Sequence, residues 1–426
     1  MKRPIYIRGA RIVDPASGRD ETADLYVRDG RIAETPPTPA ADAILIDAVD
    51  LTVVPGLIDL HVHLREPGGE EAETIETGSR AAARGGFTAV VAMPNTNPPT
   101  DSAERVARIR LRGDEVGAVR VIPAGCISAG REGRRLADLA PMAQAGALAF
   151  TDDGAAVSSD ELMLAAMKQA QQLNLVIMDH AQDRELEKRG FMHEGKFSKH
   201  WNIPGIPSEA EFRMVRRDIE LAQRTGCALH FQHVSARESV DLIRDARKRG
   251  LRVSGELTPH HLALTDADVN PDNANFRMNP PLRSDADRDA LIQAVVDGTL
   301  QAFATDHAPH TAAAKARGFT DAPPGIVGLE TAVGVTYTEL VRRGLMDLAT
   351  WLRRWTRGPA GILGIPEPSL RPGAPADLTV LDLKNEWTVR SDSFCSRSRN
   401  TPFEGRNLVG RAILTVYGGA LSWIEQ

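Results

Sequence analysis

Eight short apolar segments, each followed by a segment of helical period, constrain the fold of this 426-residue chain more than any other feature. The apolar segments are rich in Val, Ile, Leu and Ala and cover residues 57–61, 88–93, 119–124, 147–151, 175–179, 228–232, 252–256 and 300–305. The helical candidates cover residues 71–84, 102–112, 134–145, 160–173, 208–225, 236–249, 286–296 and 329–342. Such alternation predicts an α/β fold with a parallel sheet. Eight regular units over about 290 residues favour a (β/α)8 barrel of the TIM type over a doubly wound sheet.

Both ends of the chain have a different pattern. Short alternating strands are expected at residues 5–13, 24–32, 43–53, 378–382 and 412–417, with a turn signal at Asp29 and Gly30. We therefore predict a small, β-sandwich-like domain formed by residues 1–54 together with 366–426, beside a barrel domain at 55–365. Two independent β appendages are the alternative that this pattern leaves open.

Composition excludes several classes of function. The formal net charge is −6, from 51 Lys and Arg against 57 Asp and Glu, and no basic block is interleaved with aromatic residues, which argues against nucleic-acid binding. No secretory signal and no stretch of 18 apolar residues is present, so we expect no membrane partner and a cytoplasmic location. The three cysteines lie far apart without CxxC spacing, so a metal ion would be held by histidines and carboxylates.

Histidines and aspartates follow the predicted strands at the positions where a barrel carries its functional groups. His61 and His63 alternate at the end of the first strand, so both side chains point to one face. Four later strands lead to further candidates, namely Asp152 or Asp153, Asp179 or His180, His233, and Asp306 or His307. Histidine and carboxylate without sulfur suit zinc or another divalent transition metal, and six ligands are too many for one tetrahedral ion. The pattern therefore predicts two metal ions.

Three motifs carry a resemblance to a known family. They read PGLIDLHVHLREPG at residues 55–68, MPNTNP at 93–98 and ATDHAPH at 304–310, and the segments MNPPLR at 278–283 and GIVGLET at 325–331 agree with them. With these motifs the chain resembles the amidohydrolase superfamily and, within it, the longer, class I type of dihydroorotases. The resemblance spans essentially the whole chain, including the split β domain.

The resemblance implies a metal centre with two divalent ions, expected to be zinc, bridged by Asp153 and a hydroxide. One ion would be held by His61, His63 and Asp306, and the other by His180 and His233. Many relatives use a carbamylated lysine as the bridge, but no lysine occurs here between Lys2 and Lys168. Asp152 is the competing candidate for the bridging residue.

The implied reaction is the reversible cyclisation of N-carbamoyl-L-aspartate to dihydroorotate in pyrimidine biosynthesis. In the hydrolytic direction a hydroxide would attack the cyclic amide, and Asp306 would act as general base and then general acid. The substrate carboxylate needs a cation, and Arg65 offers a bidentate one. The resemblance also implies carboxylate contacts from Asn95 and His310, and contacts to the ring amides from Asn279 and the backbone near Gly325.

Two other functions remain as alternatives. One is a hydantoinase or allantoinase acting on other cyclic amides, and the other is a non-catalytic scaffold that supports aspartate transcarbamoylase. A scaffold would be expected to lose metal ligands, whereas all six are present in this chain. A partnership with aspartate transcarbamoylase and a homo-oligomeric state are left open for an active enzyme.

Other features carry weaker expectations. Residues 310–325 are weakly patterned and form either a lid over the substrate or an ordinary surface loop. Gln182 and Pro324 stand where the family more commonly has glutamate and phenylalanine. His230 is expected to be a packed interior residue, without a metal-binding role.

Overall fold

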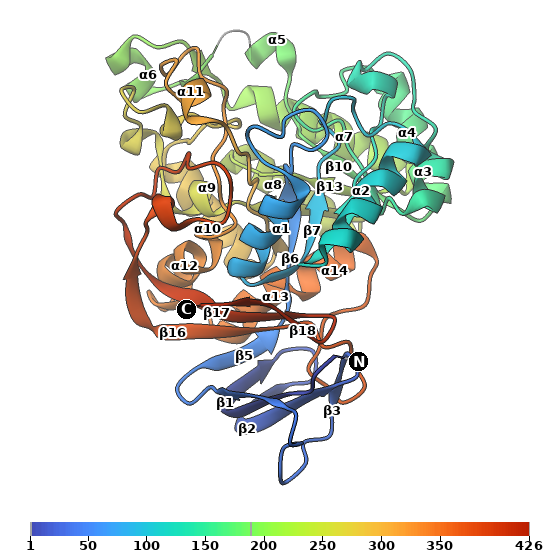
Figure 1. Ribbon diagram of the computed structural model, residues 1–426. Coiled ribbons are helices and arrows are strands. Elements are labelled where there is room, and N and C mark those ends of the chain that lie inside the picture. The colour runs from blue at the N-terminus through green and yellow to red at the C-terminus, as the bar shows by residue number, and fades with distance from the viewer. Residues whose placement is uncertain (1, 188–189, 426) are drawn as a thin grey trace.

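Eight parallel strands form the centre of the computed structural model, which describes residues 2–187 and 190–425 (Figure 1). They are β6 (Leu57–Val62), β7 (Phe87–Ala92), β8 (Arg120–Pro123), β9 (Ala149–Phe150), β10 (Val176–Asp179), β13 (Ala228–Phe231), β14 (Val253–Leu257) and β15 (Ala302–Phe303). Each lies within or overlaps one of the eight apolar segments that the sequence predicts. The predicted mixed α/β fold is confirmed.

The pairing order of these strands returns to its starting point. Strands β6, β7 and β8 pair in parallel, and so do β9, β10, β13, β14 and β15 in the order given. Two isolated parallel bridges, Gly125 to Phe150 and Val62 to His307, join the two sets. The carboxyl ends of all eight strands therefore lie around one rim.

The major helices follow the strands and cover the outside of this ring. They are α1 (Ile75–Arg84), α2 (Ala103–Val116), α3 (Leu139–Ala145), α4 (Asp160–Gln172), α7 (Glu209–Thr225), α8 (Arg237–Lys248), α10 (Asp285–Asp297) and α12 (Ala332–Thr336), the last continued by a π-helical turn at Tyr337–Val341. Two of them, α1 and α3, begin four and five residues later than the sequence predicts. Thr74 caps α1 by accepting a hydrogen bond from the Thr77 N–H, and Leu136 pairs with Ser128 before α3 begins.

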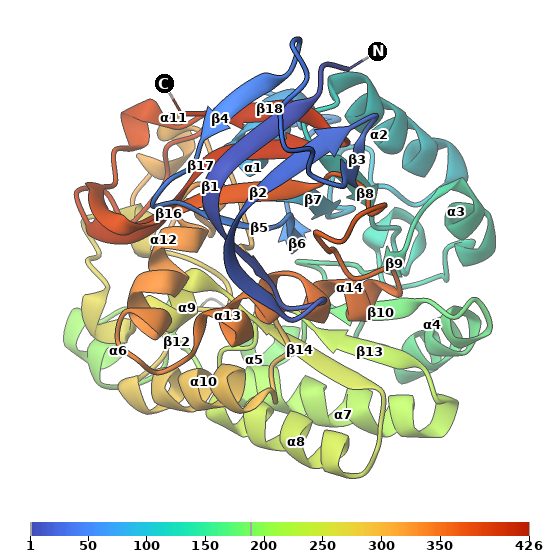
Figure 2. The same cartoon turned by 90° about the horizontal axis from the view of Figure 1, so that it is seen from below.

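Shorter elements were not predicted because they are too brief to show a period. They are α5 (Arg184–Glu187), β11 (Met192–His193), α6 (Lys196–Trp201), β12 (Gly205–Ile206), α9 (Pro259–Ala263), α11 (Ala312–Lys315), α13 (Leu348–Trp355) and α14 (Arg357–Leu363). Helix α14 lies across the amino-terminal end of the ring (Figure 2). Its Ala360 and Leu363 belong to the same buried apolar cluster as Ile58 and Ala302. That end of the ring is therefore covered, and the opposite rim is the one that receives the strand-end side chains.

Both chain ends contribute to one further sheet. Its strands are β1 (Ile5–Asp14), β2 (Arg19–Arg28), β3 (Arg31–Ala33), β4 (Ile44–Asp47), β5 (Thr52–Pro55), β16 (Leu378–Thr388), β17 (Asn407–Tyr417) and β18 (Ala420–Ile424). The order is β18-β17-β16-β5-β1-β2-β3, with β4 also paired to β1. Because β16 pairs directly with β5, the two ends share a sheet rather than forming separate appendages. Strand β18 was not predicted, and the expected strand 24–32 is a hairpin that turns at Asp29 and Gly30.

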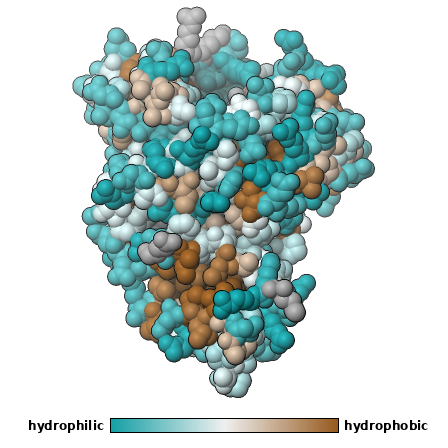
Figure 3. Space-filling view, in the orientation of Figure 1, coloured by the Kyte–Doolittle hydropathy of each residue, from teal (hydrophilic) through white to brown (hydrophobic). Residues whose placement is uncertain are grey.

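Apolar surface gathers on the lower part of the molecule, over the sheet of the chain ends (Figure 3). Among the exposed large apolar side chains, Leu45, Val49 and Ile424 belong to this sheet or to the turn beside it. No helix of the described residues combines the length and apolar character needed to cross a membrane.

Trp355 joins helix α13 to the strands of the ring, and its truncation is expected to destabilise the fold. Its fully buried ring lies 5.2 Å from the Phe87 ring and 5.1 Å from the Phe303 ring, centroid to centroid. We expect Trp355→Ala to lower the free energy of unfolding by about 3–5 kcal/mol through loss of burial and formation of a cavity. Urea denaturation measures this, with Trp201→Ala, at a side chain that is 44% exposed, as the control. Equal effects of the two variants would contradict this packing role.

Candidate metal centre and substrate pocket

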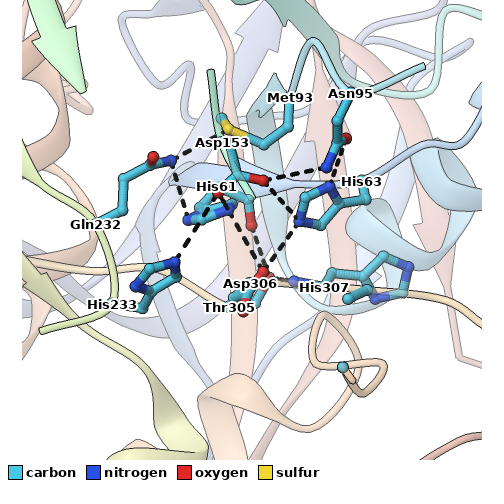
Figure 4. Close-up of polar contacts among 12 residues, drawn as sticks. His61, His63, Met93, Asn95, Asp153, Gln232, His233, Thr305, Asp306 and His307 are labelled. Carbon is cyan, nitrogen blue, oxygen red and sulfur yellow. Dashed lines mark hydrogen bonds and ion pairs between the residues drawn. The ribbon is translucent and has the colours of Figure 1, made fainter. Parts of the chain in front are cut away.

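The six side chains predicted as metal ligands converge at the carboxyl rim of the ring. They come from β6, from the residue after it, and from the segments that follow β9, β10, β13 and β15. All are buried: His61, His63, Asp153, His180, His233 and Asp306. Figure 4 shows most of them pointing toward one another. The strand ends thus bring together residues up to 245 positions apart in the sequence.

One group consists of His61, His63 and Asp306. The Asp306 Oδ1 atom lies 3.1 Å from His63 Nε2 and 3.4 Å from His61 Nε2. One potential ligand atom from each residue lies within 4.8 Å of the others, a separation that fits coordination of a common ion. This grouping is the one that the resemblance implies for the first metal ion.

A second group surrounds Asp153. Its Oδ1 atom lies 3.4 Å from His180 Nδ1, 3.9 Å from His233 Nε2 and 3.3 Å from His61 Nε2. The two imidazoles face each other directly, since His233 Nε2 is 2.8 Å from His180 Nδ1. The other carboxylate oxygen, Asp153 Oδ2, lies 3.5 Å from His63 Nε2. Asp153 therefore sits between the two groups of histidines.

Asp152 points away from these histidines. Its Oδ1 atom accepts hydrogen bonds from the backbone N–H groups of Ile127 at 2.9 Å and Ser128 at 3.0 Å, and its Oδ2 atom accepts one from the Ser128 hydroxyl. All of these donors belong to the loop after β8. The geometry therefore assigns Asp152 to holding that loop and leaves Asp153 as the carboxylate among the histidines.

The electrostatics of the centre favour a bound cation. Burial opposes protonation of His61, but the charges of Asp306 and Asp153 outweigh it and raise the pKa of His61 well above its usual value. Burial likewise opposes ionisation of Asp153, yet His61 and His180 hold the pKa of this carboxyl well below its usual value. A position that attracts a proton onto buried His61 attracts a metal cation for the same reason.

The His61 Nε2 atom provides a direct test of whether the residues fit a metal. It is buried and has no hydrogen-bond partner within residues 2–187 and 190–425, although it lies between Asp153 and Asp306. A buried polar atom without a partner is rare and calls for an explanation. Coordination of a divalent ion through this nitrogen supplies one, and neutral imidazole with carboxylate is a donor set suited to zinc.

Glu256 holds the His61 ring at its Nδ1 atom, and His230 in turn holds Glu256. The sequence did not reveal these roles. Glu256 Oε1 lies 2.9 Å from His61 Nδ1, and Glu256 Oε2 lies 2.9 Å from His230 Nε2. Burial opposes ionisation of Glu256, but His230 and His61 lower its pKa to about 2, so the carboxylate stays charged. His230 is a buried interior residue as expected, but it also anchors the carboxylate that orients a predicted ligand.

Asp59 fixes the backbone at the same place. Its Oδ1 atom accepts hydrogen bonds from the N–H groups of His61 at 3.1 Å and Thr305 at 3.0 Å. It therefore ties the first strand of the ring to the last, beside Asp306. The buried Asp59 side chain, two positions before His61, therefore holds the ends of these two strands in register.

Asn95 and Asn279, both predicted to contact substrate, are hydrogen-bonded to other side chains of the site. Asn95 Oδ1 lies 2.9 Å from His63 Nδ1, and Asn95 Nδ2 donates to Asp153 Oδ2 at 3.2 Å. Asn279 and Gln182 exchange two amide hydrogen bonds of 2.7 and 2.9 Å, and Gln182 Oε1 also lies 2.7 Å from His180 Nε2. Gln182 thus supports His180 where the family more commonly has glutamate.

Arg65 and His310 lie at the open side of the metal groups. Arg65 Nε donates to the Pro309 carbonyl at 3.1 Å, and Arg65 Nη2 lies 3.5 Å from His310 Nε2. Within the described residues, no carboxylate lies within 4.0 Å of the Arg65 guanidinium. Burial lowers the pKa of Arg65, although the charges of Asp306 and Asp153 partly oppose this effect. The site therefore presents a cation without an ion-pair partner beside the metal ligands.

Gly325 closes the site against His310. Its φ of +123° is unfavourable for other residues, and a Cβ there would lie 2.6 Å from Ala308 Cβ and 3.2 Å from His310 Nε2. Its N–H donates to the Arg277 carbonyl at 2.9 Å, and its carbonyl accepts from Asn400 Nδ2 at 3.0 Å. Only the second lone pair of that carbonyl is left to face a ligand.

These side chains share one pocket of about 200 Å³. Its walls include five of the six predicted metal ligands and all five predicted substrate-binding residues, namely His63, Asp153, His180, His233, Asp306, Arg65, Asn95, Asn279, His310 and Gly325. His61 lies behind them, fully buried. Strand-end histidines, carboxylates and an arginine can thus act on one small molecule.

Three residues of the pocket other than glycine have a left-handed backbone. The φ angles are +60° at Arg65, +32° at His233 and +48° at Asp306. Such values are costly for residues other than glycine and concentrate at functional sites, where the surrounding structure enforces them. The alternation of side chains along a strand therefore does not determine where these three point.

Comparison with known proteins agrees with this geometry. The family profile described as "Dihydro-orotase-like" matches residues 51–239. The dihydroorotase of Solibacter usitatus is 45% identical over 424 residues, 99% of each chain. That of Geobacillus kaustophilus is 48% identical over 387 residues, covering 91% of this chain and 90% of the relative.

The solved structures with a similar fold are hydantoinases. L-Hydantoinase (dihydropyrimidinase) from Arthrobacter aurescens superposes with a TM-score of 0.86 at 25% identity, over 99% of this chain and 96% of that one. D-Hydantoinase from a Bacillus sp. AR9 superposes with a TM-score of 0.83 at 24% identity, which shows the fold alone. Fold and site are those of a cyclic amidohydrolase. Within that class the chain belongs to the dihydroorotase family, as the sequence motifs predict.

Matched alanine variants separate the roles of the two adjacent aspartates. We expect Asp153→Ala to lower the metal content by about one ion per chain, because it removes the carboxylate between the two groups. Asp152→Ala should keep its metal but lose about 1–3 kcal/mol of stability, since backbone N–H groups lose their acceptor. Elemental analysis and thermal unfolding measure the two effects. Loss of metal from Asp152→Ala alone would contradict the assignment.

Glu256→Gln tests the support behind His61. We expect metal affinity to fall about 10- to 100-fold, because the neutral amide orients and polarises the imidazole less well than the carboxylate. Titration with a competing chelator measures the change without reference to turnover. Glu21→Gln, at an exposed carboxylate on β2, is the control. Unchanged affinity in Glu256→Gln would show that this carboxylate serves only the packing of the core.

Proposed function

We propose that this protein is a dihydroorotase that catalyses the reversible cyclisation of N-carbamoyl-L-aspartate to dihydroorotate. Membership of the dihydroorotase family supports the reaction class. The observation that carries the substrate assignment is Arg65, whose guanidinium has no carboxylate partner among the described residues and lines the same pocket as the metal ligands. Both substrates carry a carboxylate that such a cation would bind in a bidentate manner.

The residues present fit two divalent ions, for which zinc is the expected identity. His61, His63 and Asp306 would hold one ion, His180 and His233 the other, and Asp153 would bridge the two. When bound, the ions lower the pKa of a water molecule and polarise the carbonyl under attack. The buried carboxylates Asp153 and Glu256 keep the ligand histidines oriented and offset the positive charge.

Asp306 is the residue proposed to move the proton. Its carboxylate reaches His61 and His63 from the last strand of the ring and lines the pocket. In the hydrolytic direction it would take a proton from the attacking water and deliver it to the leaving amide nitrogen. In the biosynthetic direction the same carboxylate would take the proton from the carbamoyl nitrogen as the ring closes.

The other pocket residues would hold the ring in place. His310 donates from Nε2 to the Pro324 carbonyl at 2.8 Å, which fixes its imidazole beside Arg65. Asn279, held by Gln182, and the carbonyl of Gly325 would contact the ring amides, while Asn95 would act mainly by orienting His63. In this arrangement the substrate carboxylate would lie at Arg65, and the reacting amide would face Asp306.

We infer the domain organisation from the same architecture. The closed order of eight parallel strands corresponds to a (β/α)8 barrel at residues 55–365, and the shared sheet to a small β domain from residues 1–54 and 366–426. Association with aspartate transcarbamoylase and formation of a homo-oligomer stay predictions for this chain.

A hydantoinase is the second candidate, favoured by the solved structures to which the fold is similar. Hydantoin and allantoin lack the carboxylate that Arg65 would bind. The decisive experiment combines metal analysis of the purified protein with turnover of dihydroorotate, hydantoin and allantoin. We expect two ions per chain and preferred turnover of dihydroorotate. Preference for hydantoin, or no turnover of dihydroorotate after metals are restored, would overturn the proposal, and the second result would favour a scaffold.

Arg65→Gln tests the substrate contact. We expect KM for dihydroorotate to rise about 10- to 100-fold, because hydrogen bonds to charged groups contribute about 1.5–3 kcal/mol each. Any residual turnover of hydantoin should change little, because that molecule has no carboxylate. Arg317→Gln, at an exposed arginine in the segment after His310, is the matched control. An equal loss for both substrates would assign Arg65 to the structure of the site instead.

A further inference from the structure

A second cavity, of about 530 Å³, lies at the amino-terminal end of the barrel, opposite the metal ligands. Its walls are helix α14 and the beginnings of strands β10, β13 and β14, near Val176, Ala228 and Val253. Figure 2 looks toward this end, where α14 lies next to β10. The volume falls within the range of small-molecule sites in proteins.

Five arginines line this cavity, although the chain as a whole has a net charge of −6. They come from α8, the start of β14, α13 and α14, and they are Arg247, Arg252, Arg353, Arg354 and Arg357. Within residues 2–187 and 190–425, Arg357 alone has a carboxylate within 4.0 Å, that of Glu367. Arg353 and Arg354 are half-buried, whereas Arg247, Arg252 and Arg357 are exposed. Half-buried cations in proteins are usually paired, so these two neighbouring guanidinium groups, which have no carboxylate within 4.0 Å among the described residues, are unusual.

Backbone carbonyls hold two of these arginines in place. Arg354 Nε donates to the Val295 carbonyl at 2.9 Å, and Arg247 Nη1 donates to the Val253 carbonyl at 3.0 Å. Burial lowers the pKa of both groups, and the charge of Asp297 opposes this only in part. Each guanidinium has five N–H donors, so fixing one leaves others for a ligand. The cavity therefore presents oriented donors and an uncompensated positive charge.

One wall of the cavity is apolar. Leu175, Leu251 and Ile362 line it together with glycines of α14. A Cβ built on Gly361 would meet no atom within 4 Å, so this position faces open space. A ligand with a charged part and an apolar or aromatic part could contact both kinds of wall.

We propose that this cavity binds a small organic phosphate of nucleotide size, with its phosphate groups on the arginines and its organic part against the apolar wall. Guanidinium forks match phosphate oxygens in a bidentate manner and bind them more strongly than neutral donors do. The site lies at the opposite end of the barrel from the pocket of the proposed reaction, and it does not depend on that reaction.

Isothermal titration calorimetry of the full-length, metal-loaded protein tests this proposal, with ATP and inorganic tripolyphosphate as probes. We expect one ATP per chain and weaker binding of tripolyphosphate, which lacks the organic part. The double variant Arg247→Gln/Arg354→Gln and the single variant Gly361→Leu should each weaken ATP binding at least tenfold. Leucine fills open space and favours a helix more than glycine does, so Gly361→Leu should fold.

Controls distinguish the cavity from other sources of heat. Arg8→Gln, at a side chain that is 66% exposed on the distant sheet, should bind ATP as the unaltered protein does. Unchanged thermal unfolding and unchanged dihydroorotate turnover would verify that the cavity variants fold. Binding that persists in both cavity variants would come from chelation of the metal ions or from the general surface, and it would overturn the proposal. Equal affinity for ATP and tripolyphosphate, or no binding of ATP, would overturn it as well.

Discussion

Three buried carboxylates around one histidine are the interaction on which the rest of this structure depends. Asp153, Glu256 and Asp306 approach the nitrogens of His61 to within 3.3, 2.9 and 3.4 Å. All three carboxylates are buried, so water does not screen their charges. So much negative charge inside a protein is unfavourable unless cations balance it. The ring of strands has to hold the carboxylates in place, and divalent ions are the partners that the donor set fits.

This constraint explains features that otherwise have little reason to occur together. Asp59 ties the backbones of the first and last strands, and left-handed backbone at His233 and Asp306 directs their side chains into the centre. Such conformations persist only where many surrounding contacts enforce them. The strand ends supply those contacts at His233 and Asp306. Arg65 has the same left-handed backbone but lies, with His310, on the loops at the open side, where substrate has to enter.

The two ends of the ring of strands differ in charge. Carboxylates and histidines occupy the carboxyl rim, while five arginines line the cavity at the amino end, four of them without a carboxylate within 4.0 Å among the described residues. Strands β10, β13 and β14 run between the two, beginning at the arginine-lined cavity and ending at or just before His180, His233 and Thr258. A ligand bound among the arginines would therefore contact the same strands that position the metal ligands.

The sequence alone predicted the eight strands, the six candidate ligands and the family, because each depends on a local pattern or on a motif read along the chain. It did not decide between Asp152 and Asp153, since both follow the same strand and the turn after it is irregular. It also did not connect Glu256 and His230 with His61, nor gather the arginines of α8, α13 and α14 around one cavity. Those relations arise only when the ring of strands closes, because closure brings together side chains that lie far apart in the sequence, and burial then decides which charges must be paired.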